Sequence, residues 1–290
     1  MSPPVLHAVH TPERIALFRS GVPSALVTQS AATDHRPYIH PILAPDGVGE
    51  LTENEPGHHL WQHGLYVGLN DVNGVGFWTE GLNNSKEYDG TFHPQPLVPP
   101  TITGNQAQWE VVCEWRTPGG DPMLTETQRW SLEDRGEFLV LDMAWHLRAQ
   151  TDLRFGQYSY GGLFLRMPWR EGTGNELLTS AGATTPREAE GQRARWVAVA
   201  MPIPGRDTGL AGIALLDHPA NPEHPAPWRV DNNYGIVPSR CIAGEWFLPE
   251  GEITVSRYRV FAFTGAIRPD TVREEWDRFA RDENPNKDTL

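Results

Sequence analysis

The chain has 290 residues, a length that allows one large all-β domain or two small ones. Its formal net charge of −13 argues against nucleic acid as a partner, because affinity for phosphates comes from Lys and Arg. No run approaches the roughly 18 apolar residues of a membrane span, and the first residues lack the pattern of a secretion signal. We therefore expect a soluble, cytoplasmic protein with no membrane partner, whose oligomeric state the sequence leaves open.

The composition is typical of β structure, since 11 Trp, 28 Gly and 26 Pro indicate many short elements joined by tight turns. Alternation of apolar and polar residues predicts antiparallel strands. The expected fold is a single large antiparallel β-sandwich of about a dozen or more strands, from the ~8–12-residue spacing of turn signals. The predicted strands lie in an opening hairpin within 6–27 and at 108–116, 123–132, 137–148, 163–166, 193–201, 210–216 and 253–263. Two further segments, 83–100 and 220–239, are predicted to be loops.

Only the C-terminal segment has helical spacing. Thr271 and Glu274 form a capping box, and apolar side chains follow at positions 272, 276, 279 and 280. This predicts one amphipathic helix at 271–280 that packs on the sheet. With no repeat and no break in composition, residues 1–290 are expected to form one domain, with 283–290 as a frayed tail. Cys113 and Cys241 have no Cys or His neighbour and are expected to be reduced and buried.

Histidines are concentrated in the segment 36–78, which contains His40, His58, His59 and His63. His59 and His63 are four residues apart, a spacing that places both side chains on one face of a helix or a strand. Such a pair could supply ligands to a divalent metal or a general base that works near neutral pH. Loop histidines also serve simply as hydrogen-bonding groups, and the pattern does not choose between these roles.

Two other places carry polar residues in unusual settings. Glu126 shares a strand face with Leu124, Gln128 and Trp130, so this carboxylate is either at a strand end in water or buried with a partner. The late loop begins with Asp217 and His218, and its turn formers surround Trp228 and Tyr234. A polar and aromatic loop after a strand end is where a scaffold usually carries binding residues.

Six motifs from residue 36 to the last strand resemble the PmoA-family proteins of unknown function: RPYIHPILAPDG, HHLWQHGLYVG, DVNGVGFW, LTETQRW, GGLFLR and GIALLDHPANPEHPAPWRV. That family carries a methane-oxygenase label, which conflicts with the absence of a membrane span. Many relatives have an HPHHRG-like sequence where this chain has HLWQHG. The resemblance implies a supersandwich similar to galactose-mutarotase-like sugar enzymes and, through neighbouring genes for sugar oxidoreductases and transporters, carbohydrate chemistry.

The leading hypothesis is an enzyme that acts on a glycoside or keto-glycoside, by elimination or hydrolysis of the glycosidic bond. The proton α to the carbonyl of a keto-sugar is acidic enough for a histidine or carboxylate base, and a divalent metal ion on the carbonyl oxygen would polarise it. Two alternatives stay open: an aldose epimerase without a metal, and a sugar-binding protein without catalysis.

In the leading hypothesis the early and late loops form one cleft. The expected catalytic groups are His59, His63 and Glu126. Of the four candidate metal ligands, His58, His59, His63 and His218, His63 is expected to matter more than His58, which an extended chain turns away. The expected contacts to the sugar are Arg36, His40, Trp61, Asn73, Asp217, His218, Trp228 and Tyr234.

Overall fold

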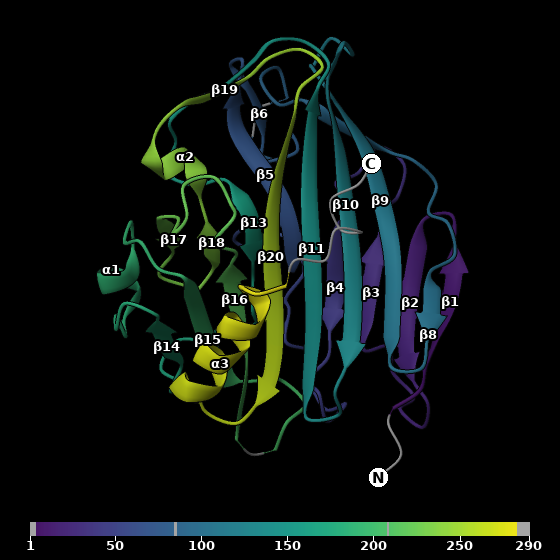
Figure 1. Ribbon diagram of the computed structural model, residues 1–290, viewed down its shortest axis with the longest axis vertical. Helices are drawn as coiled ribbons and strands as arrows, with labels where there is room; N and C mark the ends of the chain where they lie inside the picture. The colour runs from purple at the N-terminus through teal and green to yellow at the C-terminus, as the bar shows by residue number, and fades with distance from the viewer. Residues whose placement is uncertain (1–3, 84–85, 208, 283–290) are drawn as a thin grey trace.

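The structure, a computed structural model, describes residues 4–83, 86–207 and 209–282. Within these residues two large antiparallel sheets lie face to face (Figure 1). The first, with 11 strands, contains β1 Leu6–Thr11, β2 Arg14–Arg19, β3 Val27–Ser30, β4 Tyr38–Ile42, β5 Leu65–Val72, β6 Val75–Phe77, β12 Leu153–Phe155, β13 Gly162–Leu165, β17 Trp228–Val230, β18 Ile236–Pro238 and β19 Trp246–Leu248. The second, with nine, contains β7 Thr91–Pro94, β8 Thr101–Thr103, β9 Gln106–Arg116, β10 Pro122–Asp134, β11 Phe138–Ala149, β14 Glu176–Thr179, β15 Trp196–Pro202, β16 Leu210–Asp217 and β20 Ile253–Thr264.

The predicted β-sandwich is confirmed, and the alternation in the sequence explains it. On β9 the side chains of Trp109, Val111, Cys113 and Trp115 are buried, and the residues between them are more exposed. The same period-2 pattern on the facing sheet turns a second set of apolar side chains inward. The two inner faces together form the main core, in which Cys113 and Cys241 are buried free thiols, as predicted.

Part of the outer face of the nine-stranded sheet, around β15, β16 and β20, is covered by the helix α3 Pro269–Phe279, which lies at the front in Figure 1. Val272 and Phe279 of α3 pack on Phe261 and Phe263 of β20. The buried Glu275 accepts hydrogen bonds from Arg135 and Arg259 and so ties the helix to the sheet. The predicted C-terminal helix is thus confirmed, and two four-residue helices, α1 Pro186–Ala189 and α2 Arg240–Ala243, accompany it. The predicted frayed tail lies outside the described residues.

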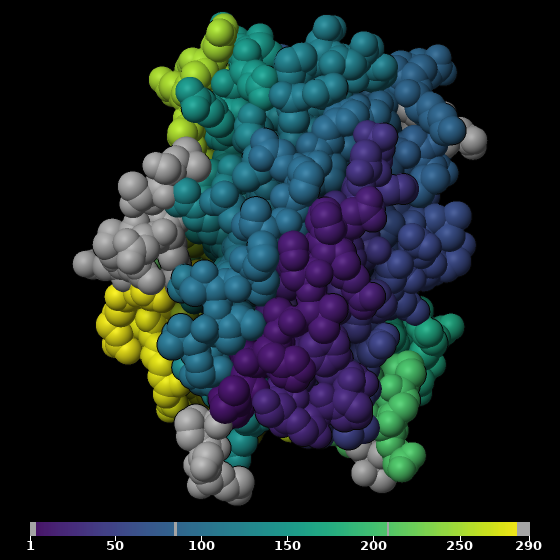
Figure 2. Space-filling view, turned by 90° about the vertical axis from the view of Figure 1, so that its right-hand side faces the viewer, coloured from purple at the N-terminus to yellow at the C-terminus, as the bar shows by residue number. Residues whose placement is uncertain are grey.

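One edge of the sandwich is closed by the N-terminal strands. The backbone N–H of Leu6 on β1 donates to the carbonyl of Gly104 beside β8, over 2.9 Å. Figure 2 shows this face, where the N-terminal strands (purple) lie directly beside residues of the nine-stranded sheet (blue). The contact blunts two edge strands that would otherwise offer unpaired backbone groups.

The two predicted loops contain short strands. Residues 91–94 form β7, which pairs with β9, and the late segment contains β17 and β18, which pair with each other. Turn-forming residues surround each of these three- or four-residue strands, so the local sequence favours a loop. The strands form because contacts with neighbouring strands stabilise them. In the described part of the chain, no helix has the length and apolarity needed to cross a membrane.

Candidate functional site

The candidate site lies on the outer face of the 11-stranded sheet, opposite to the face that carries α3. Strands β5, β13, β18 and β17 are neighbours there, although they come from three distant parts of the chain. Their inward residues join the core, while Tyr66, Phe164, Val237 and Arg229 alternate to the outside. The outward aromatic residues form a separate cluster that also includes Trp61, Trp78 and Tyr160.

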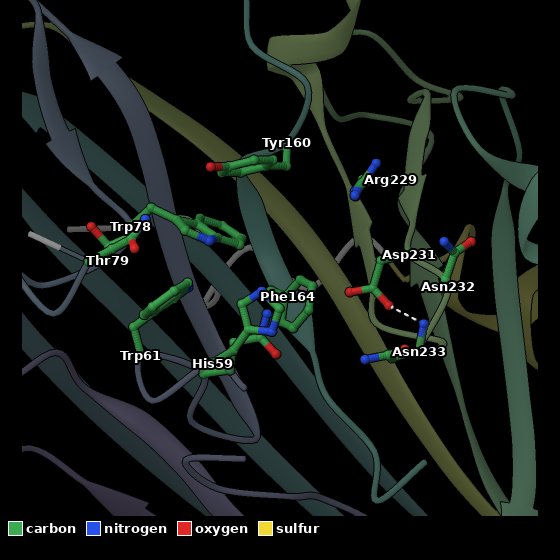
Figure 3. A pocket seen from close by; sticks show the side chains of 12 residues that line it. His59, Trp61, Trp78, Thr79, Tyr160, Phe164, Arg229, Asp231, Asn232 and Asn233 are labelled. Atoms are coloured by element: carbon green, nitrogen blue, oxygen red, sulfur yellow. Dashed lines mark hydrogen bonds between the residues drawn. The ribbon is translucent and has the colours of Figure 1, made fainter. Parts of the chain in front are cut away.

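A pocket of about 290 Å³ opens over this cluster. We call it the outer-face pocket. Figure 3 shows aromatic side chains on one side of it and polar side chains on the other. The lining residues are His59, Trp61, Gln62, Trp78, Thr79, Asn83, Tyr160, Phe164, Arg229, Asp231, Asn232 and Asn233.

His59 stands in a tight turn between β4 and β5. Its backbone N–H donates to the carbonyl of Pro56 over 2.7 Å, and its carbonyl accepts from the N–H of Gln62 over 3.1 Å. The imidazole meets the indole of Trp61 edge to face, with ring centroids 5.0 Å apart. Burial, together with the nearby positive charges of His58 and Arg166, holds the pKa of His59 below its usual value.

Neither ring nitrogen of His59 has a hydrogen-bond partner among the described residues, and Nδ1 is fully buried. Nε2 is therefore the nitrogen that a ligand in the pocket can reach. A half-buried imidazole that is neutral at pH 7 and has a free nitrogen can act as a general base.

Asp231 faces the pocket from the turn that follows β17. Its Oδ1 accepts the backbone N–H groups of Asn233 and Gly235, both over 2.8 Å. Gly235 is required at this position, because a Cβ there would lie 2.5 Å from Cζ of Phe164 and 2.6 Å from Oδ2 of Asp231. The turn therefore packs directly on the aromatic floor of the pocket and fixes the carboxylate beside it.

Arg166, at the end of β13, connects the two turns from below. Its guanidinium is almost completely buried and donates to Oε1 of Gln62 over 2.7 Å and to the carbonyl of Asn233 over 2.9 Å. A third nitrogen lies 3.4 Å from Oδ2 of Asp231. The planar fork of arginine suits such a three-way contact, which a lysine could not reproduce.

The pocket rim carries further polar groups. Arg229 donates from Nη1 to Oε1 of Glu190 over 2.7 Å, which leaves the rest of its guanidinium facing the pocket. The side-chain amide of Asn233 donates to Nε2 of His58 over 3.0 Å and so joins the early and late turns at the surface. The rim can therefore donate hydrogen bonds to hydroxyl or carbonyl oxygens.

His63 does not line the pocket. Its Nε2–H donates to Oε1 of Glu80 over 3.0 Å, and its Nδ1 lies 3.0 Å from Oδ1 of Asn54. The ring is buried and stacks on Tyr38. Although His59 and His63 are four residues apart, the turn that carries His59 closes at Gln62, and His63 already pairs with Asn54 in an antiparallel bridge, so the two rings lie in separate environments.

Arg36 is also buried, behind His63. It lies 3.2 Å from Glu80, donates to the carbonyl of Trp78 and covers the ring of Tyr66, with 4.5 Å to the centroid. Burial alone would raise the pKa of Glu80, but the positive charge of Arg36 and the bond from His63 outweigh it and lower the pKa to about 2. Arg36 therefore supports the pocket from beneath and does not contact a ligand in it.

Glu126 lies in the core between the sheets. Its carboxylate accepts hydrogen bonds from Nε1 of Trp115 over 3.0 Å, from Nε1 of Trp145 over 2.8 Å and from Gln128 over 2.9 Å. Burial raises its pKa, although these three bonds oppose the shift. The sequence left open whether this carboxylate is at a strand end in water or buried with partners, and the structure shows that it is buried with partners. Glu126 therefore does not lie among the residues that line the outer-face pocket.

The expected cleft between the early turn and the start of the late loop does not form. Asp217 accepts bonds from Asn221 and His224 at the end of β16, and His218 packs edge to face on Phe279 of α3. Trp228 is fully buried between the sheets and donates its indole N–H to the carbonyl of Ala194, so it cannot serve as a platform for a sugar. The physical reason is that β16 belongs to the sheet on the opposite side of the sandwich.

The remaining predicted contacts also lie outside the pocket lining. His40 bonds Thr52, Asn73 bonds the backbone of Asp152, and Tyr234 packs at the margin of the main core. Of the predicted site residues, only His59 and Trp61 line the pocket, and His58 stands at its rim.

The four proposed metal ligands do not converge, since His63 and His218 have the separate surroundings described above. In the described ranges 4–83, 86–207 and 209–282, no three His, Cys, Asp or Glu side chains are grouped so that they could hold a metal ion. The divalent ion stays a prediction from the sequence, without a ligand set.

The sequence analysis missed Trp78, Tyr160, Arg166, Arg229 and Asp231. Signals were present in the sequence: Trp78 ends the motif DVNGVGFW, Arg166 ends the motif GGLFLR, and Asp231 opens the turn DNNYG three residues after Trp228. Their grouping depends on which strands are neighbours in the sheet, and local patterns do not encode that order.

The chain was compared with known protein families, curated proteins and solved structures. A family model described as "Family of unknown function (DUF6807)" matches residues 19–277. The predicted resemblance to a family of unknown function is thus confirmed, while the PmoA name is not part of that description. A search of curated proteins gave no match.

Among solved structures, similar folds include an α-galactosidase from Lactobacillus brevis, with 11% identity and a TM-score of 0.43 over 90% of this chain and 39% of that one. A galactose mutarotase related enzyme from Lactobacillus acidophilus shares 8% identity, with a TM-score of 0.37 over 90% of this chain and 97% of that one. A GH36 α-galactosidase from Geobacillus stearothermophilus shares 10% identity, with a TM-score of 0.41 over 89% of this chain and 41% of that one. At these TM-scores we transfer no activity, substrate or site residue.

Proposed function

Because the chain belongs to DUF6807, a family of unknown function, we propose a function from the site alone: the outer-face pocket binds a sugar or keto-sugar, and His59 acts on it as a general base. The observation that carries this proposal is the half-buried, neutral imidazole of His59, which has a free Nε2 in a pocket with one aromatic and one polar side.

The shape of the pocket supports a sugar as the ligand. A pyranose ring has an apolar C–H face and a belt of hydroxyls, which match the aromatic side and the polar rim respectively. Trp61, Trp78 and Tyr160 supply flat apolar surfaces, while Arg229 and Asn232 supply polar contacts. The volume of about 290 Å³ is at the lower end of ligand pockets and suits a single sugar unit.

For a keto-glycoside the chemistry runs through proton abstraction. Nε2 of His59 takes the proton from the carbon α to the carbonyl, and the C–H electron pair becomes an enolate on the carbonyl oxygen. The negative charge of Asp231 partly offsets the effects of burial, His58 and Arg166, which disfavour the imidazolium that forms on His59. The enolate then expels the aglycone oxygen from the β carbon, and the departing oxygen takes up the proton from His59.

A second candidate, an aldose epimerase without a metal, is favoured by one specific observation. Interconversion of anomers needs a group that protonates the ring oxygen and a group that takes the proton of the anomeric hydroxyl. The imidazole of His59 and the carboxylate of Asp231 are both fixed at the pocket and interact electrostatically.

The test is hydrogen–deuterium exchange in D₂O, followed by NMR, for a panel of glycosides and their 3-keto derivatives. We expect loss of the signal of the proton α to the carbonyl, with release of the aglycone, and loss of both activities in His59→Ala. His7→Ala is the matched control, because His7 is an exposed histidine outside the pocket.

Acceleration of mutarotation without exchange at the α carbon would favour the epimerase. Binding without either reaction would reduce the protein to a sugar-binding module, and no binding at all would overturn the proposal.

A further inference from the structure

A row of aromatic rings continues beyond the outer-face pocket. Inside the pocket, Trp78 meets Phe164 with ring centroids 5.5 Å apart and Tyr160 with centroids 4.6 Å apart. Tyr160 in turn meets Tyr158, with centroids 4.8 Å apart and the ring planes at 79°. Tyr158 is not among the residues that line the pocket. The row therefore runs from the floor of the pocket out onto the surface.

The outer end of this row is exposed and firmly held. The side chain of Tyr158 is 38% exposed, which is unusual for a large aromatic residue next to a cluster that is otherwise mostly buried. Its backbone N–H donates to the carbonyl of Cys241 over 3.0 Å, and the neighbouring Gln157 bonds the carbonyl of Ile242. The two tyrosine rings are not stacked flat on each other, so they do not fully cover each other's faces.

Polar groups accompany the rings at this end. The side chains of Tyr158 and Asn70 lie near the Tyr160 hydroxyl, and burial, followed by the neighbouring Tyr158, raises the pKa of Tyr160. The hydroxyl of Tyr160 therefore stays protonated, and a tyrosine hydroxyl can both donate and accept hydrogen bonds with a ligand. The surface combines aromatic faces with hydroxyl and amide groups at their edges.

We propose that Tyr158, beside Tyr160, forms an outer subsite for a second pyranose ring, so that the ligand of this protein is a disaccharide or a longer glycoside. The inference rests on the proposed function, since it extends the sugar site by one unit. The inner pocket holds the terminal unit, and the linked unit lies on Tyr158.

A pyranose fits this end of the row better than an aryl aglycone does. An aryl group would use only the ring faces and would leave the hydroxyls of Tyr158 and Tyr160 and the amide of Asn70 without a role. A pyranose uses both, because its C–H face stacks and its hydroxyls bond at the edges. The rim residues Arg229 and Asn232 continue the polar side in the same way.

The experiment measures affinity by calorimetry for methyl glycosides of glucose, galactose and mannose, and for disaccharides that end in the same units. In the wild type, the disaccharide of the preferred unit should bind about tenfold tighter than the methyl glycoside, a gain within reach of one aromatic contact. In Tyr158→Ala that gain should fall to about twofold or less, while affinity for the methyl glycoside stays unchanged. Phe247→Ala is the matched control, because Phe247 is an aromatic residue with 63% exposure outside the row and should keep the full gain.

Folding of each variant is checked by thermal melting, and Tyr158→Phe separates the ring from the hydroxyl. If the methyl glycoside binds but the disaccharide is no tighter, the outer subsite is overturned and the proposed function stands. If neither ligand binds, the proposed function itself fails, and the subsite with it. A phenyl glycoside could also bind as much more tightly than the methyl glycoside as the disaccharide does, with the same affinities in Tyr158→Phe. In that case the occupant of the outer subsite is an aryl group, and the pyranose assignment is overturned.

Discussion

Arg166 donates a hydrogen bond from Nε to Oε1 of Gln62 over 2.7 Å, deep beneath the outer-face pocket. The same guanidinium bonds the carbonyl of Asn233, so one side chain fixes the turn that carries His59 and the turn that carries Asp231. The spacing of the two reactive groups is therefore set by a residue that is 1% exposed and does not itself line the pocket.

Replacing Arg166 by Gln should lower the free energy of unfolding by about 3 kcal/mol, because it breaks a buried charged contact and leaves Gln62 without its partner. The measurement is chemical denaturation at pH 7. Arg170→Gln is the control, since Arg170 is exposed and its ion pair with Glu53 should contribute under about 1 kcal/mol. Equal losses in the two variants would contradict the role given to Arg166.

Substitution of His59 by alanine should mainly affect activity, whereas substitution of His63 by alanine should mainly affect stability. His63→Ala removes the buried contacts of the imidazole with Glu80 and Asn54, although Glu80 keeps Arg36, and should lower the free energy of unfolding by about 2 kcal/mol. His59→Ala removes no hydrogen bond and should lower it by less than about 1 kcal/mol, yet it should abolish proton exchange on a keto-glycoside. Denaturation and exchange measured on the same two samples decide the matter. Full exchange in folded His59→Ala would end the general-base proposal.

The fold could be predicted from the sequence because alternation is a local signal. The run from Trp109 to Trp115 shows which side chains point inward, and the helical spacing of Val272, Trp276 and Phe279 marks the helix. The predicted capping box at Thr271 is wrong, because the helix begins two residues earlier, at Pro269, with Arg268 at the N-cap and no side-chain cap. The short strands β7, β17 and β18 could not be predicted, since the turn formers around them outweigh three or four residues of pattern.

The site could be predicted only in part. His59 and Trp61 are found because unusual residues gather in one turn, but Asp231 is near them only because β5, β13, β18 and β17 are neighbours in the sheet. Because the sequence does not reveal the order of strands in the sheets, His218 was wrongly grouped with His59. It lies on the other side of the sandwich, against α3. The spacing of His59 and His63 suggested one shared site, but the turn of His59 closes at Gln62 and His63 pairs with Asn54, so the two rings are apart.

Glu80 should make stability depend on pH in acid. Its pKa is about 2 in the folded protein and about 4.5 when it is free, so the unfolded chain binds the proton more strongly. The stability from Glu80 is therefore present above pH 4.5 and is lost as pH falls toward 2. A shift of this size corresponds to about 3 kcal/mol.

The measurement is the difference in unfolding free energy between the wild type and Glu80→Gln at pH 7, 5 and 3. The difference should shrink from pH 5 to pH 3, the range in which the carboxyl of the unfolded chain takes up its proton. A difference that does not change with pH would show that Arg36 and His63 do not stabilise the carboxylate.

The low pKa of His59 predicts that proton exchange on a keto-sugar rises with pH and levels off below pH 6.5, the ordinary value for histidine. The reason is that only the neutral imidazole can accept a proton. The pKa of the ring itself can be followed by NMR without any substrate, and it should match the midpoint of the rate profile. A rate that falls as pH rises through this range would mean that His59 works as an acid, as the epimerase alternative allows.

Glu126 should affect stability and leave the pocket unchanged. In Glu126→Gln one side-chain oxygen becomes an amide nitrogen, which faces the N–H donors of Trp115, Trp145 or Gln128, so the free energy of unfolding should fall by about 1–3 kcal/mol at pH 7. Because burial raises the pKa of Glu126 in the folded protein, its contribution is largest below the unfolded value near 4.5 and is lost as pH rises above it. The free energy of unfolding of the wild type should therefore exceed that of Glu126→Gln by more at pH 4 than at pH 7. This pH dependence is opposite to the one expected for the wild type and Glu80→Gln. Loss of sugar turnover in a Glu126→Gln protein with an unchanged melting temperature would restore the catalytic role that the sequence suggested.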